Sequence, residues 1–339
     1  MNPLQIKPKE PLMNGLPNYN LLGVSACFRE AMCNLMKFAK TDVTILIEGE
    51  TGTGKELAAR AAHEFSDRSG KPFIPVNCGA LPDALAESEL FGCEKGAYTD
   101  AKHARRGLVV EANNGTLFLD EVEAMSPRVQ VALLRFLQDR SFRAVGSTTI
   151  QHSNVRVIAA TNKSLDHLAR NSEFRSDLIF RLKVLSLRLP PLRERREDVS
   201  ILAKAFLHRF SNHYSLPEPK ISHQTESWFM RYHWPGNVRE LENTILRGLF
   251  LSDGCVLDIP PPDECAPLSE IRSDFLDCHF SAAKADAIAN FEFHYLKNVL
   301  IRAEGNVTQA ARISGTERSA FRKLLMRNNL SADIYRLKS

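Results

Sequence analysis

The chain has 339 residues, 44% of them apolar and 25% charged, and this ordinary globular composition is enough for two or three domains. No run of about 18 uncharged apolar residues is present, which excludes a membrane-spanning helix. The net charge of +4 is unevenly placed, because ten Lys or Arg and only five Asp or Glu lie from Lys284 onward. A nucleic-acid partner is therefore expected at that end.

Residues 1–20 contain Pro3, Pro8, Pro11 and Pro17, show no periodicity and are predicted to be an N-terminal tail. A tail this short is not a sensory domain, so control is expected from outside the chain, for example by a regulatory protein acting in trans. The seven cysteines have no metal-ligand spacing and indicate reduced thiols in a cytoplasm.

Residues 21–190 alternate between short apolar runs and helix-like stretches. This alternation predicts an α/β fold with a parallel sheet that is covered on both faces. Pro75 makes the second run the least suited to a central strand. The five runs are Val43–Ile47, Phe73–Val76, Thr116–Leu119, Val155–Ala160 and Val184–Leu189.

The rest of the chain is predicted to be helical. Residues 191–257 indicate helices only, with a break at Pro217 and Pro219. Residues 258–283 begin with an acidic, proline-rich stretch that is typical of a linker, and helices return in residues 284–339.

A glycine-rich turn follows the first predicted strand and precedes the helical run Glu56–Glu64. Backbone N–H groups of such a turn and the helix N-terminus suit the phosphates of ATP, and Lys55 would reach the β- and γ-phosphates. The alternative is a glycine-rich turn that binds no nucleotide. The residues of this predicted site are Gly49, Glu50, Thr51, Gly52, Thr53, Gly54, Lys55 and Glu56.

Polar residues end two further strands. Asp120 and Glu121 follow Thr116–Leu119, and ligands of open α/β sheets sit at the carboxyl ends of strands. Asp120 would hold Mg²⁺, and Glu121 would orient or deprotonate the attacking water. Asn162, which ends the run from Val155, could position the same water, although a plain turn-forming Asn is an equal alternative.

These residues resemble the AAA+ domain of bacterial enhancer-binding proteins, the ATPases that activate sigma-54 RNA polymerase. The resemblance covers about residues 21–258 and resumes in the last fifty-odd residues. It implies a P-loop parallel sheet with a helical lid. The matching motifs are Gly-Glu-Thr-Gly-Thr-Gly-Lys-Glu (49–56), Glu-Ser-Glu-Leu-Phe-Gly (87–92), Gly-Thr-Leu-Phe-Leu-Asp-Glu (115–121), Leu-Pro-Pro-Leu-Arg-Glu-Arg (189–195) and Trp-Pro-Gly-Asn-Val-Arg-Glu-Leu (234–241).

The resemblance also implies roles for single residues. Asn77 matches the family residue that pairs with the catalytic glutamate, here Glu121. Arg175 and Arg181 match arginine fingers that reach a neighbouring subunit's site, where guanidinium stabilises charge on the γ-phosphoryl group, although surface salt bridging is the alternative. Because such fingers act on a neighbouring subunit, a homo-oligomer is expected, from a dimer up to a hexameric ring. Arg239 matches the lid arginine that senses the γ-phosphate.

Residues Thr308–Ser314 and Glu317–Arg327 indicate a helix-turn-helix around Gly315, in which Thr316 would cap the second helix. An ordinary helical hairpin is the alternative, but residues 305–312 also resemble the Fis-type module of the family. The expected apolar face comprises Ala320, Phe321, Leu324 and Leu325. The face expected to contact double-stranded DNA comprises Arg318, Ser319, Arg322 and Lys323.

The loop that contacts sigma-54 in this family has the sequence Gly-Ala-Phe-Thr-Gly-Ala. The corresponding residues here are Gly96, Ala97, Tyr98, Thr99, Asp100 and Ala101. Asp tolerates the left-handed geometry that glycine allows, but its charge at each loop tip of a ring would repel neighbouring loops and an acidic partner. An ordinary surface turn that has lost its contact is the alternative.

Together these features predict a transcriptional activator that binds DNA and uses ATP hydrolysis to remodel the closed complexes of sigma-54 RNA polymerase holoenzyme. A DNA-binding regulator or repressor that does not engage sigma-54 is the second hypothesis. A P-loop ATPase without a role in transcription is disfavoured by the basic C-terminal module.

Overall fold

The computed structural model divides the chain into two units, residues 1–262 and 263–339, which are described separately. Within them the structure describes residues 15–16, 21–97, 103–252, 254–262, 292, 295–297, 299–300, 302–303, 305–328 and 330.

The first unit is built on a five-stranded sheet in the order β11-β3-β10-β7-β4, in which every neighbouring pair is parallel. All five predicted strands are present, so the predicted α/β fold is confirmed. Pro75 lies in β4, an edge strand, where its missing N–H removes no hydrogen bond inside the sheet. The strands are β3 (Ile45–Glu48), β4 (Phe73–Asn77), β7 (Thr116–Asp120), β10 (Arg156–Thr161) and β11 (Leu185–Arg188).

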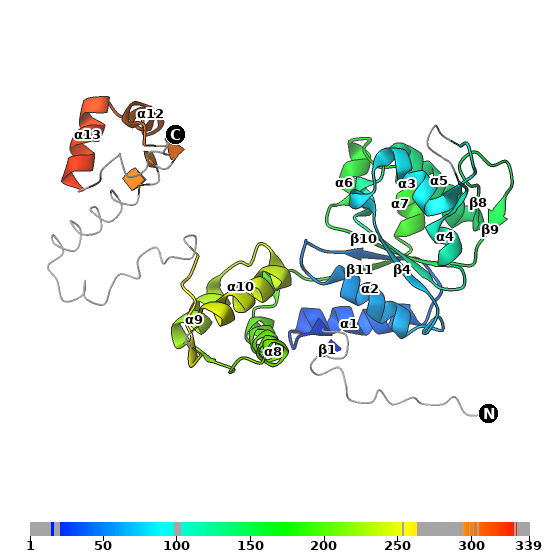
Figure 1. The fold of residues 1–339 in the computed structure, drawn as a ribbon, viewed down its shortest axis with the longest axis horizontal. Helices are drawn as coiled ribbons and strands as arrows, with labels where there is room; N and C mark the ends of the chain where they lie inside the picture. The colour runs from blue at the N-terminus through cyan, green and yellow to red at the C-terminus, as the bar shows by residue number, and fades with distance from the viewer. Residues whose placement is uncertain are drawn as a thin grey trace. The chain divides into compact units, whose positions relative to one another are not determined.

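Alternate residues of each strand face opposite layers of helices. Ile45 and Ile47 pack with α1 (Ala26–Ala39) and α2 (Lys55–Glu64), whereas Leu46 packs with the helices of the other face. Because both faces are covered, the three central strands β3, β7 and β10 are mostly apolar, as expected of a buried parallel sheet (Figure 1). The second face is covered by α3 (Asp83–Phe91), α4 (Leu108–Glu111), α5 (Pro127–Asp139), α6 (Leu165–Arg170) and α7 (Ser176–Leu182).

Short elements connect these layers. Three 3₁₀ turns follow the strands β4, β7 and β11. Two small antiparallel hairpins lie in sequence between the helices of the second face. These elements are η3 (Cys78–Ala80), η4 (Val122–Ala124), η5 (Leu192–Glu194), β5 (Gly92–Cys93) with β6 (Arg105–Arg106), and β8 (Ser141–Phe142) with β9 (Gln151–His152).

The helical subdomain of the first unit contains α8 (Glu197–Tyr214), α9 (His223–Arg231) and α10 (Asn237–Leu251). The prediction of helices only was wrong here, because β12 (Lys220–Ile221) pairs in parallel with β13 (Val256–Leu257). The proline break leaves the chain extended, and the Lys220 N–H donates to Cys255 O at 3.1 Å. Trp228 and Trp234 stack with ring centroids 5.7 Å apart in the core of this subdomain.

Two residues of the predicted N-terminal tail belong to a sheet. The strand β1 (Gly15–Leu16) pairs antiparallel with β2 (Leu21–Leu22), and Gly15 lies opposite Leu22. A strand of two residues has too few positions to show an alternating pattern, so periodicity could not reveal it.

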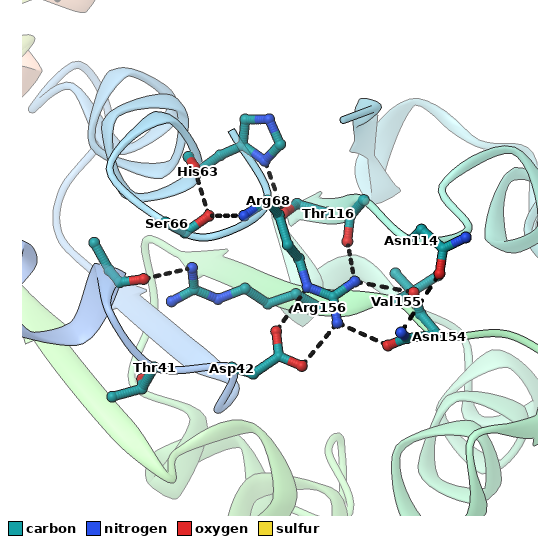
Figure 2. A network of polar contacts seen from close by, with 12 residues as sticks. Thr41, Asp42, His63, Ser66, Arg68, Asn114, Thr116, Asn154, Val155 and Arg156 are labelled. Atoms are coloured by element: carbon teal, nitrogen blue, oxygen red, sulfur yellow. Dashed lines mark hydrogen bonds and ion pairs between the residues drawn. The ribbon is translucent and has the colours of Figure 1, made fainter. Parts of the chain in front are cut away.

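A polar network closes the amino-terminal edge of the sheet (Figure 2). Arg68 donates to both carboxylate oxygens of Asp42 at 2.7 Å and to Asn154 Oδ1 at 2.7 Å. The same guanidinium donates to the carbonyl oxygens of Gly115 and Asn154 at 3.0 Å. The side chain of Arg68 thus ties the loops before β3, β7 and β10 to the end of α2 and retains little capacity for a ligand.

Arg156, at the start of β10, is fully buried beside this network (Figure 2). Its guanidinium donates to Phe38 O, Ala39 O and Ala62 O, at 2.8 to 3.3 Å. These carbonyls belong to the last turns of α1 and α2, where no intrahelical donor is available and where a positive charge is favoured. Arg156 therefore holds both helices of one face onto the sheet.

His63 gives the first unit a testable pH dependence. The residue is 2% exposed, its Nδ1 lies 2.9 Å from Thr116 Oγ1, and burial lowers its pKa below the ordinary value. As pH falls through about 6.5, the unfolded state binds the proton first, so the free energy of unfolding decreases down to the folded-state pKa. We expect His63→Gln to flatten this slope between about pH 7 and 5 in urea unfolding followed by circular dichroism. Replacement of the exposed His152 by Gln should leave the slope unchanged. Equal slopes in wild type and both variants would show that His63 is not the source of this pH dependence.

The second unit contains α12 (Val307–Ile313) and α13 (Arg318–Arg327). Asn306 caps α12, accepting from the N–H groups of Thr308 and Gln309 at 3.0 and 3.3 Å. Two details of the prediction were wrong. The residue at the N-cap of α13 is Glu317, while the Thr316 hydroxyl lies 2.8 Å from Ser314 Oγ. Ala320 is exposed, whereas Phe321 and Leu325 are buried and Leu324 is partly buried, so Ala320 lies at the margin of the apolar side.

Among the helices in the described part of the chain, none is long and apolar enough to cross a membrane.

Candidate ATP site and DNA-binding surface

The P-loop connects β3 to α2 and is shaped by two left-handed glycines, Gly52 with φ +79° and Gly54 with φ +100°. This turn places the first amide groups of α2, which have no partner inside the helix, at the carboxyl end of the sheet. Lys55 Nζ donates to the carbonyl oxygens of Gly49 and Glu50 at 2.8 and 3.1 Å. The ammonium group is thus held inside the loop where a triphosphate would lie.

Lys55 is only 9% exposed, and burial lowers its pKa. The carboxylate of Asp120, followed by those of Glu123 and Glu121, acts in the opposite direction and favours the charged lysine. A buried ammonium group next to carboxylates suits a site for a magnesium-bound polyphosphate, because both signs of charge are matched by such a ligand.

The two acids after β7 differ in their surroundings. Asp120 is half-buried, its Oδ1 accepts the Glu121 N–H at 3.0 Å, and burial raises its pKa. Glu121 has a φ of +55°, a left-handed conformation that non-glycine residues rarely adopt. This strained residue directly follows the strand, and strained backbone of this kind clusters at functional sites.

Asn77 lies opposite Asp120 in the parallel pairing of β4 with β7. Its Oδ1 accepts the Ala80 N–H at 3.1 Å, and no hydrogen bond among the described residues joins it to Glu121. Gly79 separates the two: a β-carbon there would lie 2.5 Å from Glu121 Oε2 and 3.3 Å from Asn77 Oδ1. The glycine thus leaves space for a carboxylate beside the amide.

Asn162 follows β10 and contacts the P-loop directly. Its Nδ2 donates to Thr51 Oγ1 at 3.4 Å, and its N–H donates to Glu123 Oε1 at 3.3 Å. Three strand ends, those of β3, β7 and β10, therefore meet around one point.

The helical subdomain packs onto the P-loop through Asn237, which sequence reasoning missed. This fully buried residue has a φ of +53°. Its Nδ2 donates to Glu50 Oε2 at 3.2 Å and to Thr51 O at 3.0 Å, while its Oδ1 accepts the Leu192 N–H at 2.8 Å. The motif at 234–241 was recognised, but only Arg239 was assigned a role in it, although a buried asparagine in a tight turn is a signal for such a bridge.

Further contacts fix this junction. Val238 N donates to Gly52 O at 3.0 Å, and a β-carbon on Gly52 would lie 2.3 Å from Gly236 O. Arg193 forms an ion pair with Glu50 at 2.6 Å, and its guanidinium lowers the pKa of that carboxyl. The helical subdomain is therefore joined to the P-loop backbone by several direct contacts.

Beside this junction, the P-loop and the strand ends form a cleft of about 290 Å³. It receives side chains from the P-loop, from three strand ends and from α10, and it includes Glu56, which also pairs with Arg60 at 3.0 Å. The lining residues are Thr51, Gly52, Gly54, Lys55, Glu56, Leu57, Asn77, Asp120, Glu121, Asn162, Val238, Arg239 and Glu242.

The two predicted arginine fingers lie elsewhere. Arg175 and Arg181 do not line this cleft; they occupy the start and the end of α7 on the surface. Arg175 pairs with Asp177 at 2.7 Å, and Arg181 is exposed with no ion-pair partner in the described parts of the chain.

The predicted sigma-54 loop leaves from the hairpin of β5 and β6, in which Gly92 lies opposite Arg106. Gly96 has a φ of +82°, and the Ala97 N–H donates to Glu94 O at 3.2 Å. Tyr98, Thr99, Asp100 and Ala101 lie outside the described residues.

The DNA-binding surface predicted on α13 is accessible. Arg318, Ser319, Arg322 and Lys323 are all exposed, while Phe321 and Leu325 pack against the other helices of the unit. A short helix with an outward basic side and a buried apolar side can lie in a major groove.

Comparison with known proteins decides the family. The model "Sigma-54 interaction domain" matches residues 21–188, "AAA+ ATPase lid domain" matches residues 193–260, and "Bacterial regulatory protein, Fis family" matches residues 287–325. The transcriptional regulatory protein ZraR of Klebsiella oxytoca is 40% identical over 309 residues, which cover 91% of this chain and 69% of ZraR. The chain belongs to the family of transcriptional regulators with a Sigma-54 interaction domain. The resemblance to this family that the motifs indicated is therefore confirmed.

Two other similar proteins extend the comparison. The phenol regulator MopR of Acinetobacter guillouiae is 39% identical over 306 residues, 89% of this chain and 55% of MopR, so the chain spans about half the length of that relative. The crystal structure of NtrX from Brucella abortus in complex with ATP superimposes with a TM-score of 0.66 at 32% identity, covering 92% of this chain and 69% of NtrX. The family fold thus comprises an AAA+ sheet, a lid and a helix-turn-helix module.

Proposed function

We propose that this chain is an ATP-dependent transcriptional activator that binds upstream DNA and remodels sigma-54 RNA polymerase closed complexes by ATP hydrolysis. The observation that carries the proposal is the convergence of Lys55, Asp120 and Glu121 in one cleft with Asn162 and the lid residue Arg239. Most of this cleft belongs to the segment that matches the Sigma-54 interaction domain, and Val238, Arg239 and Glu242 belong to the segment that matches the lid domain.

The residues of the cleft fit ATP and Mg²⁺. The amides at the start of α2 and the Lys55 ammonium would bind the phosphates, and the half-buried Asp120 carboxylate would hold the metal ion. When bound, Mg²⁺ would neutralise charge that develops on the phosphates. Glu121 would accept the proton of the attacking water, Asn162 would orient that water, and Arg239 would contact the γ-phosphate from the lid.

Hydrolysis would use a neighbouring copy of the chain. Arg175 and Arg181 lie at the two ends of α7. Two apolar residues in the same stretch are exposed, Phe180 at 80% and Val184 at 54%. An exposed apolar surface next to two arginines supports contact between subunits, with the guanidinium groups directed at the neighbour's γ-phosphate. The proposed assembly is a ring, hexameric in its active form.

The nucleotide state would reach the sigma-54 loop through η3 and α3. Asn77 caps η3 beside the Glu121 carboxylate, and α3 leads from η3 to the hairpin that carries the loop 96–101. Loss of the γ-phosphate would change the charge facing Glu121 and so the position of Asn77.

Transcription from a sigma-54 promoter with purified core polymerase, sigma-54 and ATP tests this proposal, with wild type compared with Asp100→Gly. We expect ATP-dependent transcripts from wild type. A second function, a DNA-binding regulator without sigma-54 contact, is favoured by the charge of Asp100. Transcripts from Asp100→Gly alone, with normal ATP turnover in both proteins, would support that second function.

The basic side of α13 predicts how DNA binding responds to mutation. Arg322→Ala should remove one phosphate contact, so affinity should fall for all sequences and the slope of log affinity against log salt should decrease by about 1. Fluorescence anisotropy with a labelled duplex at several salt concentrations measures both. Lys297→Ala, a charge change at an exposed position of the same unit, should leave the slope unchanged. Equal slopes for Arg322→Ala and wild type would place the DNA elsewhere.

A further inference from the structure

A third carboxylate, that of Glu123, stands behind the predicted catalytic pair. It lies in η4, two residues after Glu121. Its Oε1 accepts the Asn162 N–H at 3.3 Å, whereas its Oε2 is buried and has no hydrogen-bond partner among the described residues. Buried polar atoms normally have hydrogen-bond partners. A buried carboxylate oxygen without one destabilises the fold, so its presence suggests a functional role.

Glu123 begins a series of contacts across the sheet edge. It fixes the backbone of Asn162 after β10, and the Asn162 side chain in turn donates to Thr51 Oγ1 of the P-loop at 3.4 Å. The elements β7, β10 and β3 are thereby joined at the point where the γ-phosphate would lie. Without Glu123, the Asn162 N–H would lose the acceptor that holds the turn after β10.

The charge of Glu123 also acts on the cleft. After Asp120, it contributes most to keeping Lys55 charged, ahead of Glu121. It also adds to the effects that raise the pKa of Asp120, after burial and Glu121. Glu123 is therefore close enough to the site to influence it, although it does not line the cleft itself.

We propose that Glu123 is a positioning residue for ATP hydrolysis, which holds the Asn162 amide beside the P-loop so that the attacking water is oriented. The inference rests on the proposed ATPase function. Glu123 acts through Asn162 rather than on the nucleotide, so its removal should reduce turnover while binding of ATP is retained. Misplacement of an orienting group by a fraction of an ångström to 1 Å lowers rates by about ten- to a hundredfold.

The test uses steady-state phosphate release by the full chain with Mg-ATP, together with equilibrium binding of a fluorescent ATP analogue. Glu123→Ala removes the acceptor, and Glu123→Gln keeps an oxygen acceptor for the Asn162 N–H without the charge. Glu111→Ala, at an exposed glutamate, is the matched control. Asn162→Ala, alone and combined with Glu123→Ala, shows whether the two residues act together.

We expect kcat of Glu123→Ala to fall about ten- to a hundredfold with KM and analogue affinity changed by less than about threefold, and Glu123→Gln to retain most activity. In the Asn162→Ala background, Glu123→Ala should cost little more. Wild-type turnover in Glu123→Ala, equal loss in the Ala and Gln variants, or full additivity with Asn162→Ala would overturn the inference. A merely structural role would instead lower analogue binding and the unfolding temperature together. Absence of hydrolysis by wild type would defeat the proposed function itself.

Discussion

Glu121→Gln should abolish most ATP hydrolysis while ATP binding is retained. The amide cannot accept a proton from water, and loss of a general base lowers rates by about 10²- to 10⁴-fold. Binding should persist because the phosphate ligands are elsewhere, in the P-loop and in Lys55. Phosphate release and binding of a fluorescent ATP analogue measure the two effects separately.

Glu111→Gln is the control for this experiment, since Glu111 is an exposed glutamate outside the cleft. It should hydrolyse ATP at the wild-type rate. Turnover by Glu121→Gln within about threefold of wild type would exclude Glu121 as the base and would require another proton acceptor in the cleft.

Asp198→Ala should strongly destabilise the first unit. Asp198 is fully buried in α8 and accepts the N–H groups of Val24 and Ser25 at 2.6 and 2.9 Å and the Ser25 hydroxyl at 2.8 Å. Asp198 also interacts with the buried guanidinium of Arg195. Burial lowers the pKa of Arg195, and the negative charge of Asp198 opposes this by favouring the charged guanidinium. Removing the carboxylate leaves an uncompensated buried charge, a change that costs about 3–5 kcal/mol.

Urea unfolding followed by tryptophan fluorescence measures this loss, because both tryptophans, Trp228 and Trp234, lie in the helical subdomain that contains Asp198. The matched control is Asp166→Ala, which removes an exposed ion pair with Lys183 at 3.1 Å and should cost less than about 1 kcal/mol. Equal losses in the two variants would show that Asp198 does not anchor the N-terminal segment.

The sequence predicts the sheet and the cleft well because their signals are local. Five apolar runs bounded by turns become five parallel strands, and each polar residue at a strand end is brought to the same edge. Lys55, Asp120 and Asn162 could be placed together from this rule alone, since the carboxyl ends of parallel strands share one edge.

Contacts between distant segments were harder to predict. Asn237 bridges Glu50 and Leu192, and Glu123 holds Asn162, but each partner depends on how the lid and the strand-end turns fold back. The strands β12 and β13 have two residues each, too short for a periodic pattern. At α13 the N-cap is Glu317 rather than Thr316, and Ala320 is exposed because the buried side of the helix is centred on Phe321 and Leu325.

The most direct test of the central claim counts heparin-resistant open complexes formed by sigma-54 holoenzyme on a promoter with an upstream site for this chain. With wild-type chain and ATP, open complexes should accumulate. They should be absent with a non-hydrolysable analogue, and Glu121→Gln with ATP should give none. Hydrolysis of ATP by DNA-bound wild-type chain without any open complexes would contradict the proposed activator function.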